Sequence, residues 1–522
     1  MKRLELPAVL GVWAAALAAI VPRGNFPIND DWDFALATWN FARTGHFAFT
    51  KFTAVSLRAQ VLWGALWTRL FGESFDVLRA STIVLGAVAI IAVHRTLARA
   101  GAGAWGRVIG TLAFAFHPVF LWSSCTYMTE VPYVCASAIA LYCFVRGFDE
   151  ERAGWIVAGC VAAAAATFVR QTGVVNLAVP LALALWRKRW RDAGTIAATM
   201  LAFALLLLFK REWVSGSPAE FAVHYRVWSE ATFRLPQQIE AAYHWFAFNA
   251  QNCGLFLLPL AAPLAFTRWS RRLLIAAGIV AVLLFVRAQS LITLGHPMPY
   301  FASPYCCDVY AGNVLADFGL GPQALRGAYP IQLTMAARLA LTYASVVLGA
   351  LLTVAFARRR ETSSAGLLAI GLTLVSTAAL VASALYVDRY ELDSAWAMAV
   401  ALPLAVPWRS RAARATAVAA LVAVAVFGVI SVRDYFAWNR ARWQAFHDLR
   451  ARGVAVSDID GGAEIFDLYE LSRGDQRMRR IYLFGVPARR YTIAYSALPG
   501  QRVIATYPWK RGAAVVVNET SD

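Results

Sequence analysis

Long apolar runs, separated by short basic segments, dominate the sequence. A membrane-spanning helix needs about 20 mostly apolar residues, and thirteen stretches of the chain come near that length. These stretches are residues 5–22, 77–97, 106–122, 128–146, 154–169, 173–187, 194–210, 246–266, 273–290, 335–356, 364–386, 393–408 and 412–431. We therefore predict an α-helical polytopic membrane protein with about 13 transmembrane helices.

The basic residues between these runs favour one orientation in the membrane. They cluster at residues 2–3, 95–107, 187–191, 268–272, 358–360 and 409–414. Short loops rich in Arg and Lys remain in the cytoplasm. An odd number of spans then places the N-terminus in the cytoplasm and the C-terminus outside. The outer face receives the long polar segments, residues 23–76, 211–245, 291–334 and the tail from 432.

The tail after the last run is predicted to form a small soluble domain. Residues 434–452 have apolar positions at helical spacing, and Gly453 follows as a helix stop. Strand-like runs then occur at 480–486, 491–495, 503–507 and 513–517. We expect two domains, a membrane domain of residues 1–431 with a first outer loop at 23–76, and an α/β domain of residues 432–522 on the outer face.

The composition agrees with a membrane protein and argues against an ordinary soluble protein. Hydrophobic residues make up 59% of the chain and charged residues 15%, whereas soluble proteins contain about 45–50% and about 25%. The net charge of +18 is typical of nucleic-acid binding, but most of the basic residues lie in the loops assigned to the cytoplasm. The charge is therefore mainly a signal of topology. Seven His and seven Cys residues show no metal-ligand spacing.

Acidic residues gather immediately after the first apolar run, in Asn29-Asp30-Asp31-Trp32-Asp33. One interpretation is structural: Asn29 or Asp30 caps a helix over about 31–43 that ends at Gly45, while the other acids complement its dipole. The functional interpretation is that Asp30 or Asp31 points into a cavity at the membrane surface and acts as a base. The two interpretations are compatible, since one Asp can cap the helix while its neighbour faces the cavity.

Two further charged sites lie at predicted outer helix ends. Glu130 begins an apolar run within the segment Tyr127–Tyr133, where Thr129 is a candidate cap and Glu130 either sits in the first turn or is functional. Asp388-Arg389-Tyr390-Glu391 begins another run, where Arg389 either pairs with a sequence neighbour or offers a cation to an anionic ligand. Guanidinium groups suit phosphate because their forked donors match its oxygens.

Several other cations are predicted on the same side of the membrane. Arg170 separates the short runs 154–169 and 173–187, whose connecting turn is expected to line a cavity. Lys51 and Arg58 lie in the first outer loop. Together with Arg389 they are candidates for binding phosphate. We expect the acidic and basic sites to meet in one pocket.

The order of these segments resembles the C-type membrane glycosyltransferases, in particular the bacterial branch similar to protein O-mannosyltransferases and the lipid A aminoarabinose transferase. The matching elements are Asp30-Asp31, Tyr-Met-Thr-Glu-Val-Pro at 127–132, Val-Arg-Gln-Thr-Gly at 169–173, Asp-Arg-Tyr at 388–390, and the tail segments 433–435 and 460–462. The resemblance implies a multi-pass enzyme of the bacterial inner membrane. It would move a hexosyl or pentosyl group from a polyprenyl-phosphate donor to a glycan, lipid or protein acceptor at the periplasmic face, usually with inversion.

The resemblance also implies roles for individual residues. Asp30 or Asp31 is then the base that deprotonates the acceptor hydroxyl. Glu130 occupies a position that assists the active site or binds a metal in relatives, so no cofactor is certain and a divalent metal remains open. The remaining motif residues, Tyr127, Asp388 and Tyr390, are expected to line the substrate pocket.

The chemistry of such a donor agrees with the residues present. A lipid phosphate is already a good leaving group, so one base and cations around the departing phosphate suffice. No Gly-rich nucleotide-binding loop lies between a strand and a helix, which argues against a nucleotide-sugar donor. The alternative function is a transporter or flippase of a lipid-linked glycan, which broken helices at matching positions in two inverted halves would favour. Only the single short pair at 154–187 shows such a break.

Overall fold

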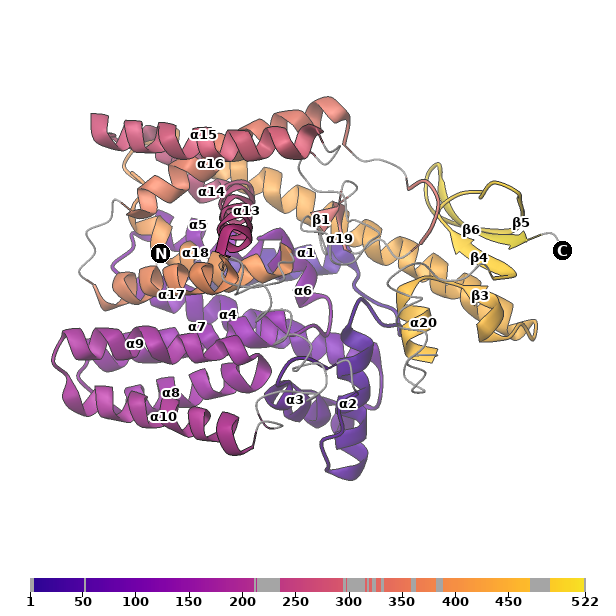
Figure 1. Ribbon diagram of the computed structural model, residues 1–522, viewed down its shortest axis with the longest axis horizontal. Helices are drawn as coiled ribbons and strands as arrows, with labels where there is room; N and C mark the ends of the chain where they lie inside the picture. Colours follow the sequence, from indigo (N-terminus) through magenta and orange to yellow (C-terminus); the bar gives the residue numbers. More distant parts are fainter. Residues whose placement is uncertain are drawn as a thin grey trace.

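A computed structural model gives the arrangement of most of the chain. The residues described are 4–50, 53–210, 213, 235–293, 297, 315–316, 319–321, 325–329, 333–357, 363–381, 388–469 and 489–520. Helices form most of the described part of the chain, and a small sheet lies at the end opposite the N-terminus (Figure 1). The prediction of an α-helical membrane protein with a small α/β tail is confirmed.

Seven helices in the described part of the chain are long and apolar enough to cross a membrane. They are α4 (Phe75–Arg99), α7 (Glu130–Asp149), α10 (Trp190–Phe209), α15 (Arg271–Thr293), α16 (Met335–Ala357), α17 (Ser364–Val381) and α19 (Arg411–Ala451). An eighth span arises if α5 (Ala104–Ala115) and α6 (Pro118–Ser124) are counted together, although the pair is bent by 60°. Pro118 explains the bend, because its ring cannot continue the preceding helix.

The other predicted spans are shorter or interrupted helices. They are α1 (Glu5–Ile20), α8 (Ala153–Val169), α9 (Val175–Trp186), α13 (Leu235–Phe256) with α14 (Leu258–Ala261) and the 3₁₀ turn Ala262–Phe266, and α18 (Leu392–Ala401) with the 3₁₀ turn Leu402–Leu404. Every predicted run thus contains helix, but the count of 13 spanning helices is not confirmed. Pro259, Pro263 and Pro403 lie where two of these helices give way to short turns. The end of the predicted span 364–386 lies outside the described residues.

The first outer segment forms two helices against one end of the bundle (Figure 1). Helix α2 (Asp31–Thr44) begins and ends close to the predicted positions, and Gly45 closes it with a φ of 74°, which favours glycine. Helix α3 (Arg58–Phe71) follows and packs against α2. The segment therefore forms a helical pair that carries the acidic residues of the first loop.

A single helix joins the membrane part to the tail. The predicted span 412–431 and the predicted tail helix 434–452 are one continuous helix, α19, of 41 residues, or about 60 Å. No Pro interrupts this stretch, and Gly453, with a φ of 84°, follows its end. The two-helix interpretation is therefore wrong, and the proposed domain boundary at 431/432 falls inside a helix.

The second half of α19 supports the tail sheet. The order of strands is β3 (Ile459–Asp460), β4 (Tyr491–Ala494), β6 (Ala513–Thr520) and β5 (Gln501–Lys510). The β3–β4 pair is parallel and the other two pairs are antiparallel. Asp434 of α19 accepts hydrogen bonds from Trp509 Nε1 at 3.1 Å and from Lys510 Nζ at 3.1 Å. The predicted strand 480–486 lies outside the described residues. A separate small hairpin is formed by β1 (Leu315–Ala316) and β2 (Gly319–Leu320).

Small residues allow two of the long helices to approach closely. Helices α13 and α16 cross where Gly254 faces Gly349, and a Cβ placed on Gly254 would lie 2.6 Å from the backbone nitrogen of Gly349. A Cβ on Gly349 would lie 2.7 Å from the carbonyl oxygen of Ala250. Such close backbone contact is typical of helix packing in membranes.

This crossing gives a direct test of the fold. The Gly254→Ala variant is expected to be destabilised by roughly 1–3 kcal/mol, because the new methyl group meets backbone that cannot move aside. The measurement is the midpoint of thermal unfolding in detergent. Gly278→Ala in α15 is the matched control, since a Cβ there meets nothing within 4 Å. Equal midpoints for the two variants would contradict this packing.

Candidate active site

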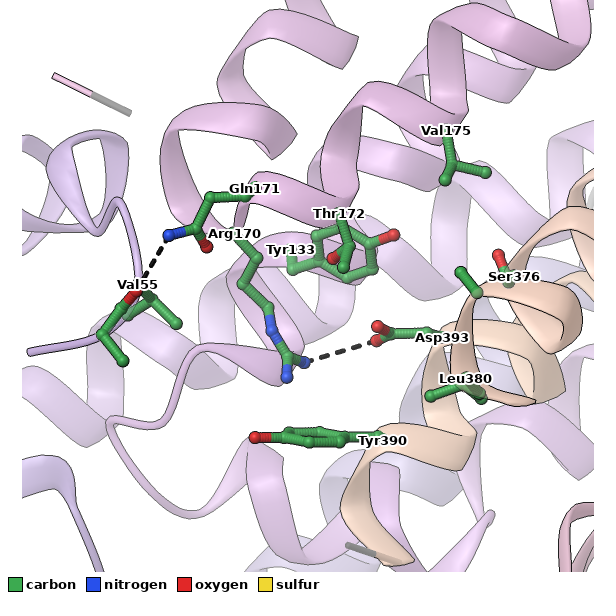
Figure 2. A pocket seen from close by; sticks show the side chains of 12 residues that line it. Val55, Tyr133, Arg170, Gln171, Thr172, Val175, Ser376, Leu380, Tyr390 and Asp393 are labelled. Carbon is green, nitrogen blue, oxygen red and sulfur yellow. Dashed lines mark hydrogen bonds and ion pairs between the residues drawn. The ribbon is translucent and has the colours of Figure 1, made fainter. Parts of the chain in front are cut away.

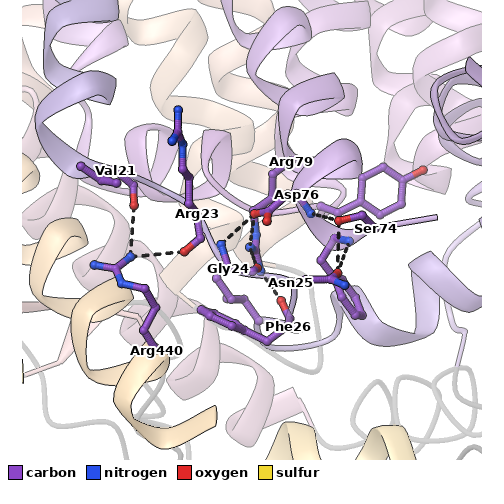
Figure 3. Close-up of polar contacts among 12 residues, drawn as sticks. Val21, Arg23, Gly24, Asn25, Phe26, Ser74, Asp76, Arg79 and Arg440 are labelled. Atoms are coloured by element: carbon purple, nitrogen blue, oxygen red, sulfur yellow. Dashed lines mark hydrogen bonds and ion pairs between the residues drawn. The ribbon is translucent and has the colours of Figure 1, made fainter. Parts of the chain in front are cut away.

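The loop after α1 is held in place by α4 and α19, as Figure 3 shows. The guanidinium of Arg79, fully buried in α4, donates hydrogen bonds to the carbonyl oxygens of Gly24 and Phe26. The neighbouring Asp76 Oδ1 accepts from the Gly24 backbone N–H at 2.8 Å. From α19, Arg440 Nη1 donates to the carbonyl oxygens of Val21 and Arg23, both at 3.2 Å. The loop therefore brings Asp30 and Asp31 to a fixed place at the end of the bundle.

Asp31 is completely buried and serves to connect two segments. Its Oδ1 accepts from the Ile28 backbone N–H at 2.6 Å, and its Oδ2 accepts from the Tyr127 backbone N–H at 3.3 Å. Burial raises the pKa of Asp31 to about 7, although the positive charge of Arg79 lowers it. The Asp31 side chain thus holds the first loop against the Tyr127 segment.

Asp30 differs from its neighbour in exposure and in partner. Its side chain is 49% exposed, and its Oδ2 accepts a hydrogen bond from Arg389 Nη2 at 2.9 Å. Asp30 occupies the N-cap position of α2 but makes no capping hydrogen bond. The expectation that Asp30 caps this helix through its side chain is therefore wrong, because Asp30 is engaged by a distant cation instead.

Glu130 lies between two guanidinium groups. It begins α7 and is 1% exposed, and its Oε1 lies 3.4 Å from Arg389 Nε and 3.7 Å from Arg170 Nη1. Thr129 makes no side-chain capping bond to α7, so the capping interpretation of that residue is also wrong. Arg170 in turn lies 3.3 Å from Asp393 Oδ1 through Nη1. Two cations and three carboxylates, Asp30 included, form one connected network.

Helix ends supply most of the members of this network. Asp30 precedes α2, Glu130 begins α7, Arg170 follows α8, and Arg389 lies in the 3₁₀ turn Asp388–Glu391 before α18. Charges buried at membrane depth are costly unless they are paired. Burial lowers the pKa of Arg389, but Asp30 and Glu130 outweigh burial and raise it overall. The local pairing of Arg389 with Asp388 or Glu391, one alternative from the sequence, is not what forms.

A cavity of about 290 Å³ lies beside Arg170 (Figure 2). The Arg170 guanidinium is 4.8 Å from the centre of the Tyr390 ring and 5.8 Å from that of Tyr133. Gln171 Nε2 donates to the Ala54 carbonyl at 2.8 Å. The remaining lining residues are Val55, Thr172, Val175, Ser376, Ala379, Leu380 and Asp393. The cavity thus combines a cation and two aromatic rings with an apolar wall, a combination suited to an amphiphilic anion.

The other residues predicted for the site lie in different places. Tyr390 lines the cavity, but Tyr127 does not. Tyr127 is buried elsewhere, and its hydroxyl donates to the Gln60 carbonyl at 3.0 Å. Arg58 donates through Nη1 to the Trp213 carbonyl at 2.8 Å and lies 5.0 Å from the centre of the Phe49 ring. It is therefore packed into the first loop rather than into the Arg170 cavity.

The remaining two residues predicted for the site are Asp388 and Lys51. Asp388 is buried at 1% exposure in the turn that carries Arg389 and does not line the cavity. Lys51 lies outside the described residues.

Sequence reasoning missed two members of this region. Asp393 is an ionisable residue within an apolar run, and this alone marks it as a candidate residue of a functional site. Glu464, from α20 (Ala463–Tyr469), accepts a hydrogen bond from the Asn29 backbone N–H at 3.1 Å and pairs with the fully buried Arg442 at 2.8 Å. No sequence signal marks this contact, because its partners are 435 residues apart.

A metal site has no support in this part of the molecule. Among the residues that the structure describes, no three His, Cys, Asp or Glu side chains gather as metal ligands. Glu130, the residue that resemblance connects with a metal, has two guanidinium groups beside it, and these disfavour a further cation. No chemical step is therefore assigned to a metal.

The fold and the charged network define the class: a polytopic membrane protein with a buried ion-pair network and a cavity at one end of its helices. Residues 62–211 match the sequence model of the dolichyl-phosphate-mannose-protein mannosyltransferase family, which confirms the resemblance inferred from the motifs over this stretch of the chain. That stretch contains Glu130 and Arg170, while Asp30 and Arg389 lie outside it. None of the curated protein sequences matches the chain.

Among solved structures, the chain is similar to ArnT from Cupriavidus metallidurans. The form bound to undecaprenyl phosphate is 15% identical with a TM-score of 0.43, covering 99% of this chain and 97% of that chain. The apo form is 15% identical with a TM-score of 0.38, covering 98% and 97%. Because these values are low, we base the function on the family match and on the site.

The burial of Asp31 predicts a specific pH dependence of stability. The folded protein holds a proton on Asp31 up to about pH 7, whereas the unfolded chain releases it near 3.8. The free energy of unfolding should therefore fall as the pH rises from about 4 to about 7. Thermal unfolding of the wild type and of Asp31→Asn across this range measures the effect. The variant is expected to lose this part of the slope, and identical slopes would contradict the assignment.

Proposed function

We propose that the protein is a membrane glycosyltransferase that moves a sugar from a polyprenyl-phosphate donor to an acceptor hydroxyl at the periplasmic membrane face. The observation that carries the proposal is the half-exposed Asp30 carboxylate held by Arg389, within a network that also contains Glu130 and Arg170. The match of residues 62–211 to the mannosyltransferase family supports the same chemistry. The enzyme then lies in the bacterial inner membrane, with its N-terminus in the cytoplasm and its C-terminus in the periplasm.

Asp30, rather than Asp31, is proposed as the base. A base must reach the hydroxyl proton that it removes, and the Asp30 side chain is 49% exposed while Asp31 is 0% exposed. Both carboxylate oxygens of Asp31 accept backbone hydrogen bonds. Asp31 therefore positions the loop, and Asp30 is available to an acceptor.

The donor phosphate is proposed to bind Arg389 by exchange with Asp30. Both guanidinium groups of the network already contact carboxylates, and the proposal is that phosphate replaces one of them. Asp30 is the most exposed of these partners, since Glu130 and Asp393 have side-chain exposures of 1% and 8%. Binding of phosphate at Arg389 would then release Asp30 for the acceptor, so that the base becomes free only when the donor is present.

The transfer step follows from this arrangement. The acceptor oxygen forms a bond to the anomeric carbon of the sugar while the bond from that carbon to the phosphate oxygen breaks. The electron pair of the broken bond goes to the phosphate, where Arg389 stabilises the developing charge, and the acceptor proton goes to Asp30. Attack opposite the leaving phosphate inverts the anomeric configuration.

The remaining residues are proposed to position the donor. Glu130 and Asp393 hold the two guanidinium groups in a fixed orientation. Arg170 and Tyr390 face the cavity, whose apolar wall of Val175, Ala379 and Leu380 suits the first isoprene units next to the phosphate. The acceptor is a glycan, a lipid or a protein, and the sugar is a hexose or a pentose.

The two roles can be separated by measuring turnover and binding together. Asp30→Asn is expected to lower kcat by about 10²–10⁴ because proton transfer is lost. It should bind a polyprenyl phosphate at least as tightly as the wild type, since Arg389 loses a competing partner. Arg389→Gln is expected to lower the rate by about 10²–10³ and also to weaken binding. Transfer from polyprenyl-phosphate sugars and titration with a polyprenyl phosphate are the measurements.

The neighbouring Asp31→Asn variant is the matched control. Once corrected for the folded fraction, its kcat is expected to stay within about tenfold of the wild type, because that residue does not contact substrate. Full turnover by Asp30→Asn would refute the base assignment. Movement of the lipid across reconstituted vesicles without any glycosidic product would instead indicate a transporter.

A further inference from the structure

A second pocket lies at the other end of the helices, far from the candidate active site. It has a volume of about 540 Å³ and is lined by the start of α1, the end of α4 and the start of α5. Helix α1 has 16 residues between this pocket and the loop that carries Asp30, which is about 24 Å. The lining residues are Glu5, Leu6, Pro7, Leu10, His94, Arg95, Ala98 and Arg107. The pocket therefore lies at the membrane boundary opposite the active site.

Two of the charged side chains in this pocket, Glu5 and Arg107, pair with each other, whereas Arg95 does not take part in that pair. Arg107 pairs with Glu5 through two hydrogen bonds, from Nε at 2.9 Å and from Nη2 at 2.8 Å. Arg107 Nη1 also donates to the Ala102 carbonyl at 2.7 Å. Arg95 is exposed and has no ion-pair partner among the residues described. With Glu5 and Arg107 neutralising each other, Arg95 gives the pocket a positive charge.

His94 gives the pocket a hydrogen-bond acceptor. The hydroxyl of Thr111 donates to the Arg107 carbonyl at 2.7 Å, so its oxygen must accept in its contact with His94 Nδ1 at 3.2 Å. Nδ1 therefore carries the imidazole proton, and in the neutral ring Nε2 carries a lone pair. No described residue makes a hydrogen bond to Nε2, while His94 itself lines the pocket and is 6% exposed.

These groups together match one kind of membrane ligand. A cation at the end of a spanning helix suits the phosphate of a lipid headgroup, and basic pockets between transmembrane helices commonly bind such headgroups. The apolar side chains of Leu6, Pro7 and Leu10 provide a surface for the first methylene groups of the lipid. The lone pair of His94 Nε2 suits a hydroxyl or ammonium donor beyond the phosphate.

We propose that this pocket binds the headgroup of a membrane phospholipid that carries a hydrogen-bond donor, with Arg95 on the phosphate and His94 Nε2 on the donor. Phosphatidylglycerol and phosphatidylethanolamine have such a donor, and phosphatidylcholine has none. The site does not depend on the sugar-transfer chemistry at the opposite end of the helices.

Native mass spectrometry of the full chain tests the proposal, with the three lipids carrying the same acyl chains. Retention of phosphatidylglycerol or phosphatidylethanolamine is expected to exceed that of phosphatidylcholine by about tenfold, the effect of one well-placed hydrogen bond. The Arg95→Gln variant should lose retention of all three lipids. The His94→Asn variant keeps a donor toward Thr111 but lacks Nε2, so it should lose the preference and keep the basal retention.

Matched controls separate the possible ligands. Arg99→Gln changes an arginine one turn further along α4 that pairs with Glu150 at 2.6 Å and does not line the pocket, so it should retain lipid as the wild type does. Equal retention of all three lipids by the wild type, or no loss in Arg95→Gln, would overturn the proposal. An equal rise of the unfolding midpoint with inorganic phosphate and with the lipids would show a site for a free anion and would also overturn it.

Discussion

Two buried guanidinium groups shared among three carboxylates hold the candidate active site together. Arg389 contacts Asp30 and Glu130, and Arg170 contacts Glu130 and Asp393. Removing one member of a buried pair leaves an uncompensated charge and typically costs about 3–5 kcal/mol. This cost applies to the buried members Glu130, Arg170 and Asp393, and the network ties the first loop to segments more than 350 residues further along the chain.

The same interaction connects stability with the proposed chemistry. With three carboxylates around two guanidinium groups, both cations of the network are already paired, and an anionic donor is proposed to enter by replacing a carboxylate. The fold makes Asp30 the replaceable one, because Arg79 and Arg440 hold the loop in place while the Asp30 side chain remains half exposed. Asp31, one residue further on, faces the interior and fixes the loop to the Tyr127 segment. Adjacent carboxylates therefore have different roles because their surroundings differ.

The sequence predicted much of this arrangement but not its details. Asp30, Glu130, Arg170 and Arg389 stood out because they interrupt apolar runs at helix ends, and an uncovered charge there needs a partner. The choice between Asp30 and Asp31 depended on which way each side chain points, which no pattern within the loop reveals. Tyr127 looked like a pocket residue but is buried between α2 and α3.

The length of α19 shows a related limit of prediction from hydropathy. Hydropathy marks where a helix leaves the apolar layer, not where its hydrogen bonding ends, so one helix of 41 residues was predicted as two. The predicted spans that form only short helices show the opposite error. Proline and charged residues end these helices inside apolar stretches that hydropathy treats as continuous. Contacts such as Glu464 with the first loop depend on how the tail packs back on the membrane part, and they lie beyond any local pattern.

The central claim is that donor phosphate replaces Asp30 at Arg389. The most direct measurement is an experimental structure of the full chain with a polyprenyl phosphate bound. The account predicts that the phosphate oxygens lie within hydrogen-bonding distance of Arg389 and that the Asp30 carboxylate has moved away from that guanidinium. A phosphate bound elsewhere, with the Asp30–Arg389 pair intact, would contradict it.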